Sequence, residues 1–437
     1  MNPALVQENA LVLTQQPAAG ARPADALVFA IPSLQFVQLN VVGVLYASEL
    51  LALSMFLWFA CKGKLKALTR SSGTFIVLGS LWFVSQFVTD IVRHSEFADF
   101  ARGWSKIAMT LVIFSLLYTL LYEQPRRLML FGWGVVAGSV LTFVVNPSEF
   151  ANDYPWKFGL AYPVTLAAFL WCSREGGRTR WPVLMSAALG FINIVLGSRS
   201  RGGICLAVAL YLLLAPPASH DSDETGLRNA KSVLMVIASI ALAVLSIFGM
   251  YRYAANSGLL GRSAKQDYED QSTGAYGILL GGRSAILGSI PAIYDSPILG
   301  HGSWARDPLY VLAQVQAMAA MGYENTSAVQ DEELEAGYIP AHSYIFGAWV
   351  EAGIVGAIFW VWVLVLAVRA LLFFPSTRVA WLPLVVFCAI SLSWDLVFSP
   401  FGAQARIIVP YYLVLLMTHL GLASLKAPQD ATAAVVS

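Results

Sequence analysis

The chain has 437 residues, of which 57% are hydrophobic and 12% are charged, and its mean hydropathy is +0.65. Soluble domains carry roughly 25% charged residues, so this composition excludes an ordinary soluble protein and indicates an all-α polytopic membrane protein. The net charge of +1 and the lack of a long basic run exclude nucleic acid as a partner. The four cysteines have no CxxC spacing, so neither a zinc site nor a disulfide framework is expected.

Residues 1–25 are rich in Ala, Pro and Gln and lack the regions of a signal peptide, so we expect a disordered tail. Apolar segments of roughly the 17–25 residues that span a bilayer follow, although 203–215 and the first two are short. The sequence therefore predicts about twelve transmembrane helices. Their ranges are 26–43, 45–61, 73–92, 107–122, 128–146, 158–172, 182–197, 203–215, 232–250, 344–368, 380–398 and 407–424.

Lys and Arg gather at alternate connections, for example 62–70, 126–127 and 174–180, which we expect to be cytoplasmic. The opposite connections also carry several basic residues. Either the outer face concentrates cations for an anionic ligand, or the preference of Lys and Arg for the cytoplasmic side is not strict in this chain. The predicted organisation is a cytoplasmic tail over 1–25, helices 1–9 over 26–250, an outer loop over 251–343, helices 10–12 over 344–425 and a cytoplasmic tail over 426–437.

The outer loop interrupts the apolar pattern and holds five basic and ten acidic residues between 251 and 342. Irregular backbone cannot cross hydrocarbon, because unpaired N–H and C=O groups are too costly there. We therefore expect this segment to lie in water against the membrane surface. Helical spacing of its apolar residues predicts two short amphipathic helices, at 283–295 and 308–322.

The motif GSRSRGG at 197–203 lies where one predicted helix leaves the membrane and the next enters it. Arg199 and Arg201 offer rigid guanidinium groups, and we expect the glycines to expose backbone N–H groups, a combination that suits a phosphate or pyrophosphate. The alternative is a stop signal with snorkelling arginines.

The outer loop holds two further candidates, in the motifs GGRS and SPILGHGS. Arg283 precedes a predicted helix, whose N-terminus favours anions, and the alternative is a surface ion pair with an acidic loop residue. His301 lies between two glycines that permit close backbone approach, and the alternative is a turn cap.

His342 follows Pro340 and Ala341 at the entrance to the 344–368 helix, and Ser343 follows it. An imidazole titrates near neutral pH and can accept a proton from a hydroxyl group as a general base. The alternative is an interfacial histidine bonded to a backbone carbonyl. We treat Ser343 as a candidate substrate-binding residue.

Four acidic residues fall inside predicted helices: Glu49, Asp90, Glu351 and Asp395. An unpaired carboxylate at the bilayer centre costs about 2.5–3.5 kcal/mol, so each is expected to face a partner or water. Asp90 lies three positions before Arg93 and is expected to pair with it along one helix face.

The order of SRSRGG, a long loop with GGRS and SPILGHGS, and AHSYIFGAWVEAGIVG resembles the O-antigen ligase family and the related O-antigen polymerases. The resemblance covers roughly 190–360 by motif and the rest by helix count and topology. His342 matches the family's loop-end histidine, Arg201 its SRG arginine and Arg283 its loop arginine. Arg199 has no clear counterpart.

The resemblance implies a glycosyltransferase in the bacterial inner membrane with a long periplasmic loop. It would transfer a glycan from undecaprenyl pyrophosphate to a sugar hydroxyl of lipid A–core, with membrane lipids as its other partners. His342 would act as the base, and Arg201 and Arg283 would stabilise the leaving pyrophosphate. Arg199, His301 and Ser343 remain substrate-binding candidates. We expect no cofactor and no metal, since the acidic runs at 267–270 and 331–335 read more simply as solvated loop charge.

Two alternatives stay open from the sequence. One is an O-antigen polymerase, whose acceptor is another lipid-linked glycan. The other is a transporter or flippase of an anionic lipid-linked substrate. A transporter binds its substrate near the bilayer midplane through broken helices, whereas the candidate residues gather at one surface, which favours the enzyme.

Overall fold

The computed structural model describes residues 23–173, 180–214, 257, 283–323, 334–372 and 380–424. Within these ranges the chain is mostly helical, which confirms the predicted class. The predicted helix at 232–250, both tails beyond these ranges and the first part of the outer loop lie outside the described residues. The placement of the tails and loop on either side of a membrane stays a prediction.

The first predicted helix, 26–43, is wrong in its second half. Helix α2 spans Pro23–Ser33 and the 3-10 helix η1 spans Leu34–Phe36, after which strands β1 (Gln38–Asn40) and β2 (Val44–Tyr46) pair antiparallel. Gly43, with φ of +100°, permits the turn between them. Apolar β-branched runs of this length suit strands as well as helices. Here the turn at Gly43 lets the two halves of the run pair as strands.

The next predicted segments are confirmed as helices, with changed bounds. Proline starts α6 at its first position, where the missing N–H costs nothing. The short helices α7 and η2 precede α8 and were not expected as separate elements. The ranges are α3 Ala47–Cys61, α4 Arg70–Arg93, α5 Phe97–Leu121, α6 Pro125–Val145, α7 Glu149–Asp153, η2 Pro155–Leu160, α8 Ala161–Cys172, α9 Trp181–Val195 and α10 Arg199–Leu214.

Both amphipathic loop helices are confirmed, as α14 (Ala285–Asp295) and α15 (Pro308–Ala320). The C-terminal helices are α17 (Tyr344–Ala352), α18 (Ile354–Leu372), α19 (Leu382–Phe398) and α20 (Ala405–Ser424). The prediction of one continuous helix over 344–368 is wrong. Gly353, with φ of +68°, separates α17 from α18, and a β-carbon there would collide with the Ile298 carbonyl oxygen.

Among the described residues, four helices are long and apolar enough to cross a membrane: α4, α5, α6 and α18. Several other helices, including α3, α9 and α19, are apolar but shorter. The chain is therefore a helical membrane protein, and the twelve spans remain a prediction.

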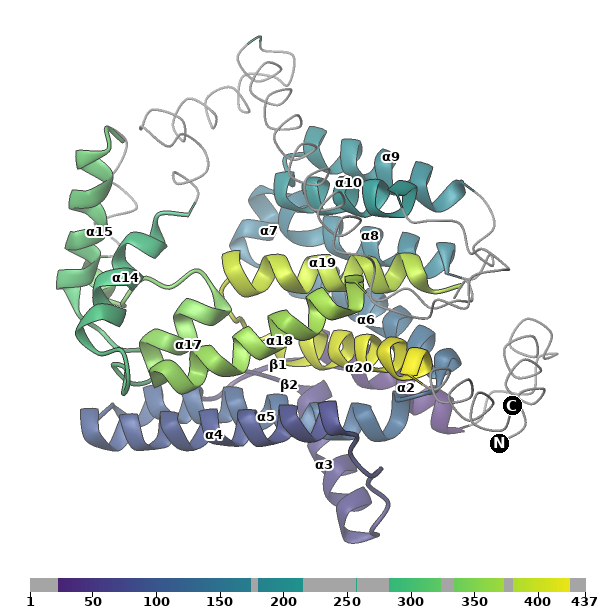
Figure 1. The fold of residues 1–437 in the computed structure, drawn as a ribbon, viewed down its shortest axis with the longest axis horizontal. Helices are drawn as coiled ribbons and strands as arrows, with labels where there is room; N and C mark the ends of the chain where they lie inside the picture. Colours follow the sequence, from purple (N-terminus) through teal and green to yellow (C-terminus); the bar gives the residue numbers. More distant parts are fainter. Residues whose placement is uncertain are drawn as a thin grey trace, which may run out of the picture.

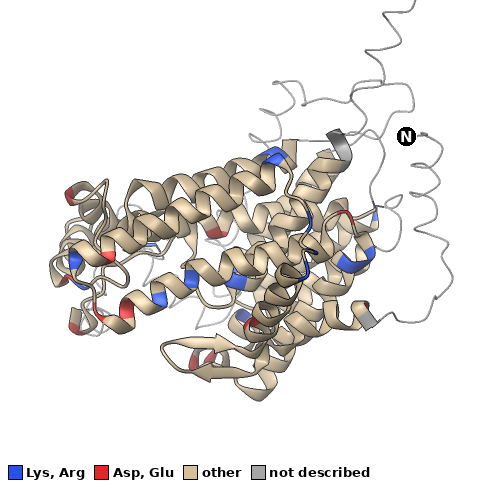
Figure 2. Cartoon of the chain, turned by 90° about the horizontal axis from the view of Figure 1, so that it is seen from below, with Lys and Arg blue, Asp and Glu red and all other residues tan. Residues whose placement is uncertain are grey.

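In Figure 1, α4 and α5 run along one side of the molecule, while α8, α9 and α10 form the opposite side. Between these layers lie α18, α19 and α20, and the core is centred on α20, whose residues 411–417 are all buried. Helices α14 and α15 stand at one end, beside α17. Figure 2 shows several of the acidic residues at that end, whereas basic residues also lie along the helices and at the opposite end.

The expected Asp90–Arg93 ion pair is not formed. Asp90 instead accepts hydrogen bonds from the Ser303 backbone N–H at 2.6 Å and from the Ser303 hydroxyl at 2.7 Å. Arg93 donates to the Gly300 carbonyl at 3.0 Å and to the Ser296 hydroxyl at 2.8 Å. Both side chains therefore fasten the SPILGHGS segment to the end of α4, a tertiary contact that helical spacing cannot reveal.

The other acidic residues in helices have partners too. Glu49 is fully buried and its two carboxylate oxygens meet Arg406 at 2.6 and 2.9 Å. Glu351 pairs with Lys106 at 2.6 Å. These contacts confirm the expectation that carboxylates in apolar helices face partners.

Candidate functional site

Arg201 lies in the first turn of α10, because the helix begins at Arg199. The expectation that the motif's glycines expose backbone N–H groups fails for Gly202. Its N–H donates to the Ser198 carbonyl at 2.9 Å, and a β-carbon there would collide with Ile194 of α9. This glycine serves close helix packing, as small residues do in membrane proteins.

The Arg201 guanidinium lies over the ring of Tyr162, 5.0 Å from its centroid. Tyr162 comes from α8, and its hydroxyl accepts a hydrogen bond from the Tyr412 hydroxyl of α20 at 3.1 Å. Three helices thus fix the position of the guanidinium, and an aromatic face attracts a cation without occupying its N–H donors.

Arg283 immediately precedes α14, and its guanidinium lies 5.5 Å from the Trp394 ring centroid and 5.7 Å from that of Phe398. Trp394 and Phe398 lie one turn apart on α19, so both rings belong to one helix face. Partial burial lowers the pKa of Arg283, and the nearby Asp395 opposes that shift. The guanidinium keeps its charge at neutral pH.

Asp395 of α19 is the residue that connects the two arginines. Its carboxylate interacts electrostatically with both Arg201 and Arg283, and it accepts a hydrogen bond from the Ser399 hydroxyl at 2.8 Å. The sequence marked Asp395 as an acid that needs a partner but did not include it among the site residues. An acidic residue in an apolar helix is a functional candidate by default, so its position in the sequence alone could have identified Asp395 as a site residue.

His342 is held next to this helix by its neighbour Ser343. The Ser343 hydroxyl donates to the Leu396 carbonyl of α19 at 2.8 Å and accepts from the Phe346 N–H at 3.2 Å, so it caps α17. Partial burial, and then the positive charge of Arg283, lower the pKa of His342. The ring is therefore mostly neutral at pH 7 and remains exposed at the surface.

The structure thus links Arg201 and Arg283 electrostatically to Asp395, and His342 to Arg283. These residues come from α10, the segment before α14 and the segment before α17. An anion between the guanidinium groups would meet two fixed positive charges, and a neutral imidazole is available beside them.

Of the remaining candidates, His301 has a different environment. Its Nε2 is 2.7 Å from the Ala292 carbonyl oxygen, and its ring packs edge-on against Tyr310. These contacts fasten the far end of α14. Arg199 opens α10 two residues before Arg201. The substrate-binding roles predicted for Arg199, His301 and Ser343 stay predictions.

Two cavities flank the cluster. One, of about 220 Å³, reaches Ala341 and Ser343 on either side of His342. The other, of about 300 Å³, reaches Tyr162 beside Arg201 and is lined largely by amide and hydroxyl side chains, among them Gln38, Asn146 and Gln404. Space for a ligand therefore lies beside the chain neighbours of His342 and beside the Tyr162 ring on which the Arg201 guanidinium rests.

The described residues contain no group of three or more His, Cys, Asp or Glu side chains placed to hold a metal ion. The loop acids considered from the sequence, Asp267, Glu269, Asp270 and 331–333, lie outside the described residues. The expectation that no metal takes part stays a prediction.

Residues 185–361 match a family model described as O-antigen ligase. This segment belongs to the O-antigen ligase family. Searches of the curated proteins and of the solved structures found no match to the chain.

The O-antigen ligase segment extends from α9 into α18 and contains Arg201, Arg283 and His342. Asp395, Tyr162 and Tyr412, which complete the cluster, lie outside it. Family members are glycosyltransferase-like enzymes, and the match agrees with the resemblance read from the motifs.

Proposed function

We propose that the protein is an O-antigen ligase that transfers a glycan from undecaprenyl pyrophosphate to a sugar hydroxyl of lipid A–core. The supporting observation is that Asp395 interacts electrostatically with Arg201 and Arg283, and Arg283 with His342, while these three basic residues lie in the segment that matches the O-antigen ligase family. The reaction takes place at the periplasmic face of the inner membrane, where both lipid-anchored substrates are accessible.

Arg201 and Arg283 bind the pyrophosphate of the donor. As the bond between the anomeric carbon and the phosphate oxygen breaks, that oxygen keeps the electron pair. The two guanidinium groups stabilise the charge that develops there. The charge of Asp395 acts on both guanidinium groups, and the Tyr162 and Trp394 rings lie against Arg201 and Arg283 respectively.

His342 activates the acceptor. Its neutral imidazole takes the proton from the acceptor hydroxyl while the hydroxyl oxygen forms the new bond to the anomeric carbon. The lowered pKa of His342 keeps the ring unprotonated before the reaction. This one-step displacement needs neither a metal nor a carboxylate nucleophile, so the product carries the inverted anomeric configuration.

The test uses the full chain, purified and reconstituted, with a polyprenyl-pyrophosphate-linked glycan as donor and rough lipopolysaccharide as acceptor. We expect transfer with inversion, read by gel and by NMR of the new linkage. Arg201→Lys and Arg283→Lys should each lower kcat/KM by about 10²–10³-fold, the usual cost of losing one oriented donor to a developing oxyanion. Arg369→Lys, an exposed position at the end of α18, is the matched control.

Retention of the anomeric configuration, or full transfer by either site variant, would contradict the proposed mechanism. Deletion of the protein in cells distinguishes ligase from polymerase. Polymer that remains on undecaprenyl pyrophosphate supports the ligase, whereas core bearing single repeats would assign the protein as a polymerase.

A further inference from the structure

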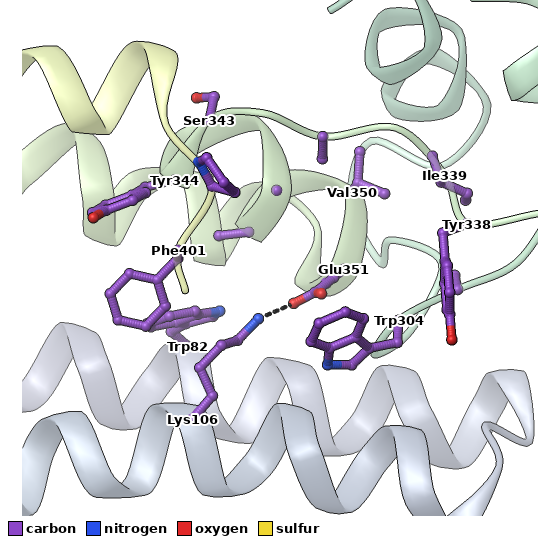
Figure 3. Close-up of a pocket in the computed structure, with 15 residues that line it drawn as sticks. Trp82, Lys106, Trp304, Tyr338, Ile339, Ser343, Tyr344, Val350, Glu351 and Phe401 are labelled. Atoms are coloured by element: carbon purple, nitrogen blue, oxygen red, sulfur yellow. Dashed lines mark hydrogen bonds and ion pairs between the residues drawn. The ribbon is translucent and has the colours of Figure 1, made fainter. Parts of the chain in front are cut away.

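The cavity beside His342 has walls that the pyrophosphate chemistry does not use. Figure 3 shows Trp82, Trp304, Tyr338, Tyr344 and Phe401 around it. At about 220 Å³ it is smaller than the roughly 300–1,000 Å³ of sites for drug-sized ligands. Its size suits one ring of a ligand and not an extended chain of rings.

Polar groups lie on the floor of this aromatic cavity. Lys106 of α5 and Glu351 of α17 form an ion pair at 2.6 Å, and their side chains are 14% and 16% exposed. Trp82 is 1% exposed, and its Nε1 has no hydrogen-bond partner among the described residues. Figure 3 shows that nitrogen on the side of the ring that faces Lys106. A buried N–H without a partner is costly, and an oxygen atom of a bound ligand would satisfy this donor.

Trp304 forms the outer wall in an unfavourable backbone conformation. Its φ is +52°, a value that bulky residues rarely adopt. The side chain is 42% exposed and stands edge-on to Tyr338. Such strain persists where the surrounding structure enforces it, and it concentrates at ligand sites. Here the preceding residue, Ser303, is hydrogen-bonded to Asp90. This contact fixes the backbone so that the Trp304 indole lies over the cavity.

The combination of aromatic walls with a polar floor favours a saccharide as the ligand. An acyl chain would leave the Trp82 N–H without a polar partner, and an anion would gain little from an ion pair whose two charges cancel. A sugar ring presents apolar C–H faces to indole rings. Its hydroxyl groups can donate to the Glu351 carboxylate and accept from Lys106 and from Trp82.

We propose that the cavity formed by Trp82, Lys106, Trp304 and Glu351 is a saccharide subsite that binds the acceptor sugar and presents its hydroxyl to His342. The inference rests on the proposed transferase function, because Ala341 and Ser343 line the cavity on both sides of the base. It assigns the acceptor, rather than the donor, to this side of the cluster.

Trp304→Gly tests the subsite with little risk to the fold. Glycine adopts a φ of +52° without strain, which offsets part of the packing that is lost with the indole, while the outer wall of the cavity is removed. His94→Gly is the matched control, since His94 is an exposed residue with φ of +53° at the end of α4. Both variants relieve the same backbone strain, and only one alters the cavity.

The probe is the core oligosaccharide released from rough lipopolysaccharide of the source cells. Calorimetric titration of the full chain should give at least about tenfold weaker binding for Trp304→Gly, and steady-state kinetics should give a similar rise in acceptor KM. The donor KM and kcat should stay near wild type. His94→Gly should match the wild type in every measurement.

Three results would overturn the subsite: no binding of the oligosaccharide by the wild type, unchanged binding by Trp304→Gly, or an equal loss of donor and acceptor affinity. If the wild type binds the oligosaccharide but transfers no glycan, the proposed ligase function fails. The titration then decides the subsite alone, since weakened binding by Trp304→Gly still supports it and unchanged binding refutes it.

Discussion

Replacing His342 with alanine tests the central step of the proposed mechanism. The pKa of this histidine lies below its ordinary 6.5, first through partial burial and then through Arg283. At pH 7.5 the ring is therefore more than about 90% neutral. A positioned general base contributes about 10²–10⁴-fold to rate, which corresponds to about 2.7–5.5 kcal/mol of activation free energy. We expect kcat to fall by that factor at pH 7.5.

Donor binding should survive this change, because Arg201, Arg283 and Asp395 remain in place. Single-turnover kinetics in lipid nanodiscs separate the chemical step from binding, and a competition titration with undecaprenyl pyrophosphate measures donor affinity. The pH profile has a definite sign. Protonation inactivates the base, so wild-type kcat/KM should fall as the pH drops through a pKa below 6.5 and stay level above it.

His94→Asn is the control histidine variant, since asparagine tolerates the left-handed conformation at the end of α4. It should keep wild-type rates and the wild-type pH profile. If His342→Ala transfers glycan at a wild-type rate, or if it loses donor affinity and chemistry to the same extent, His342 is not the base and another group must accept the proton.

Three further outcomes follow from the contacts. Arg283→Gln removes a positive charge near His342, so the pKa of His342 should rise. The acid limb of the residual kcat/KM profile should then move to higher pH, and an unmoved limb would contradict the electrostatic interaction between the two residues. Asp395→Asn keeps the shape of the side chain but removes the charge that acts on both arginines. We expect kcat/KM to drop by about tenfold, which corresponds to about 1.4 kcal/mol of activation free energy, and wild-type kinetics would remove this role. Gly353→Ala should lower the free energy of unfolding by at least about 1–3 kcal/mol, because alanine is strained at φ of +68° and its β-carbon would collide with the Ile298 carbonyl. Denaturation in detergent measures the stability of the variant, and an unchanged midpoint would refute the prediction.

Much of the candidate site was predictable from the sequence, because charged residues in an apolar chain are conspicuous. Arg201, Arg283 and His342 stood out at the ends of apolar segments, and the motif order gave the family that the comparison with family models then matched. The two amphipathic loop helices were predicted from spacing alone. Their apolar faces follow the period of 3.6 residues, and no tertiary information is needed to read it.

Composition and hydropathy determined that this is a helical membrane protein, since the hydrophobic effect acts on each segment by itself. Tertiary structure alone decided the rest. It separated Asp90 from Arg93 by giving each a better partner in the 296–303 segment, and it broke the 344–368 helix at Gly353 to admit that segment. It also brought Asp395 into electrostatic interaction with two arginines that lie more than 80 residues apart in the chain. Such contacts join residues distant in sequence, and their energies depend on packing that no local pattern encodes.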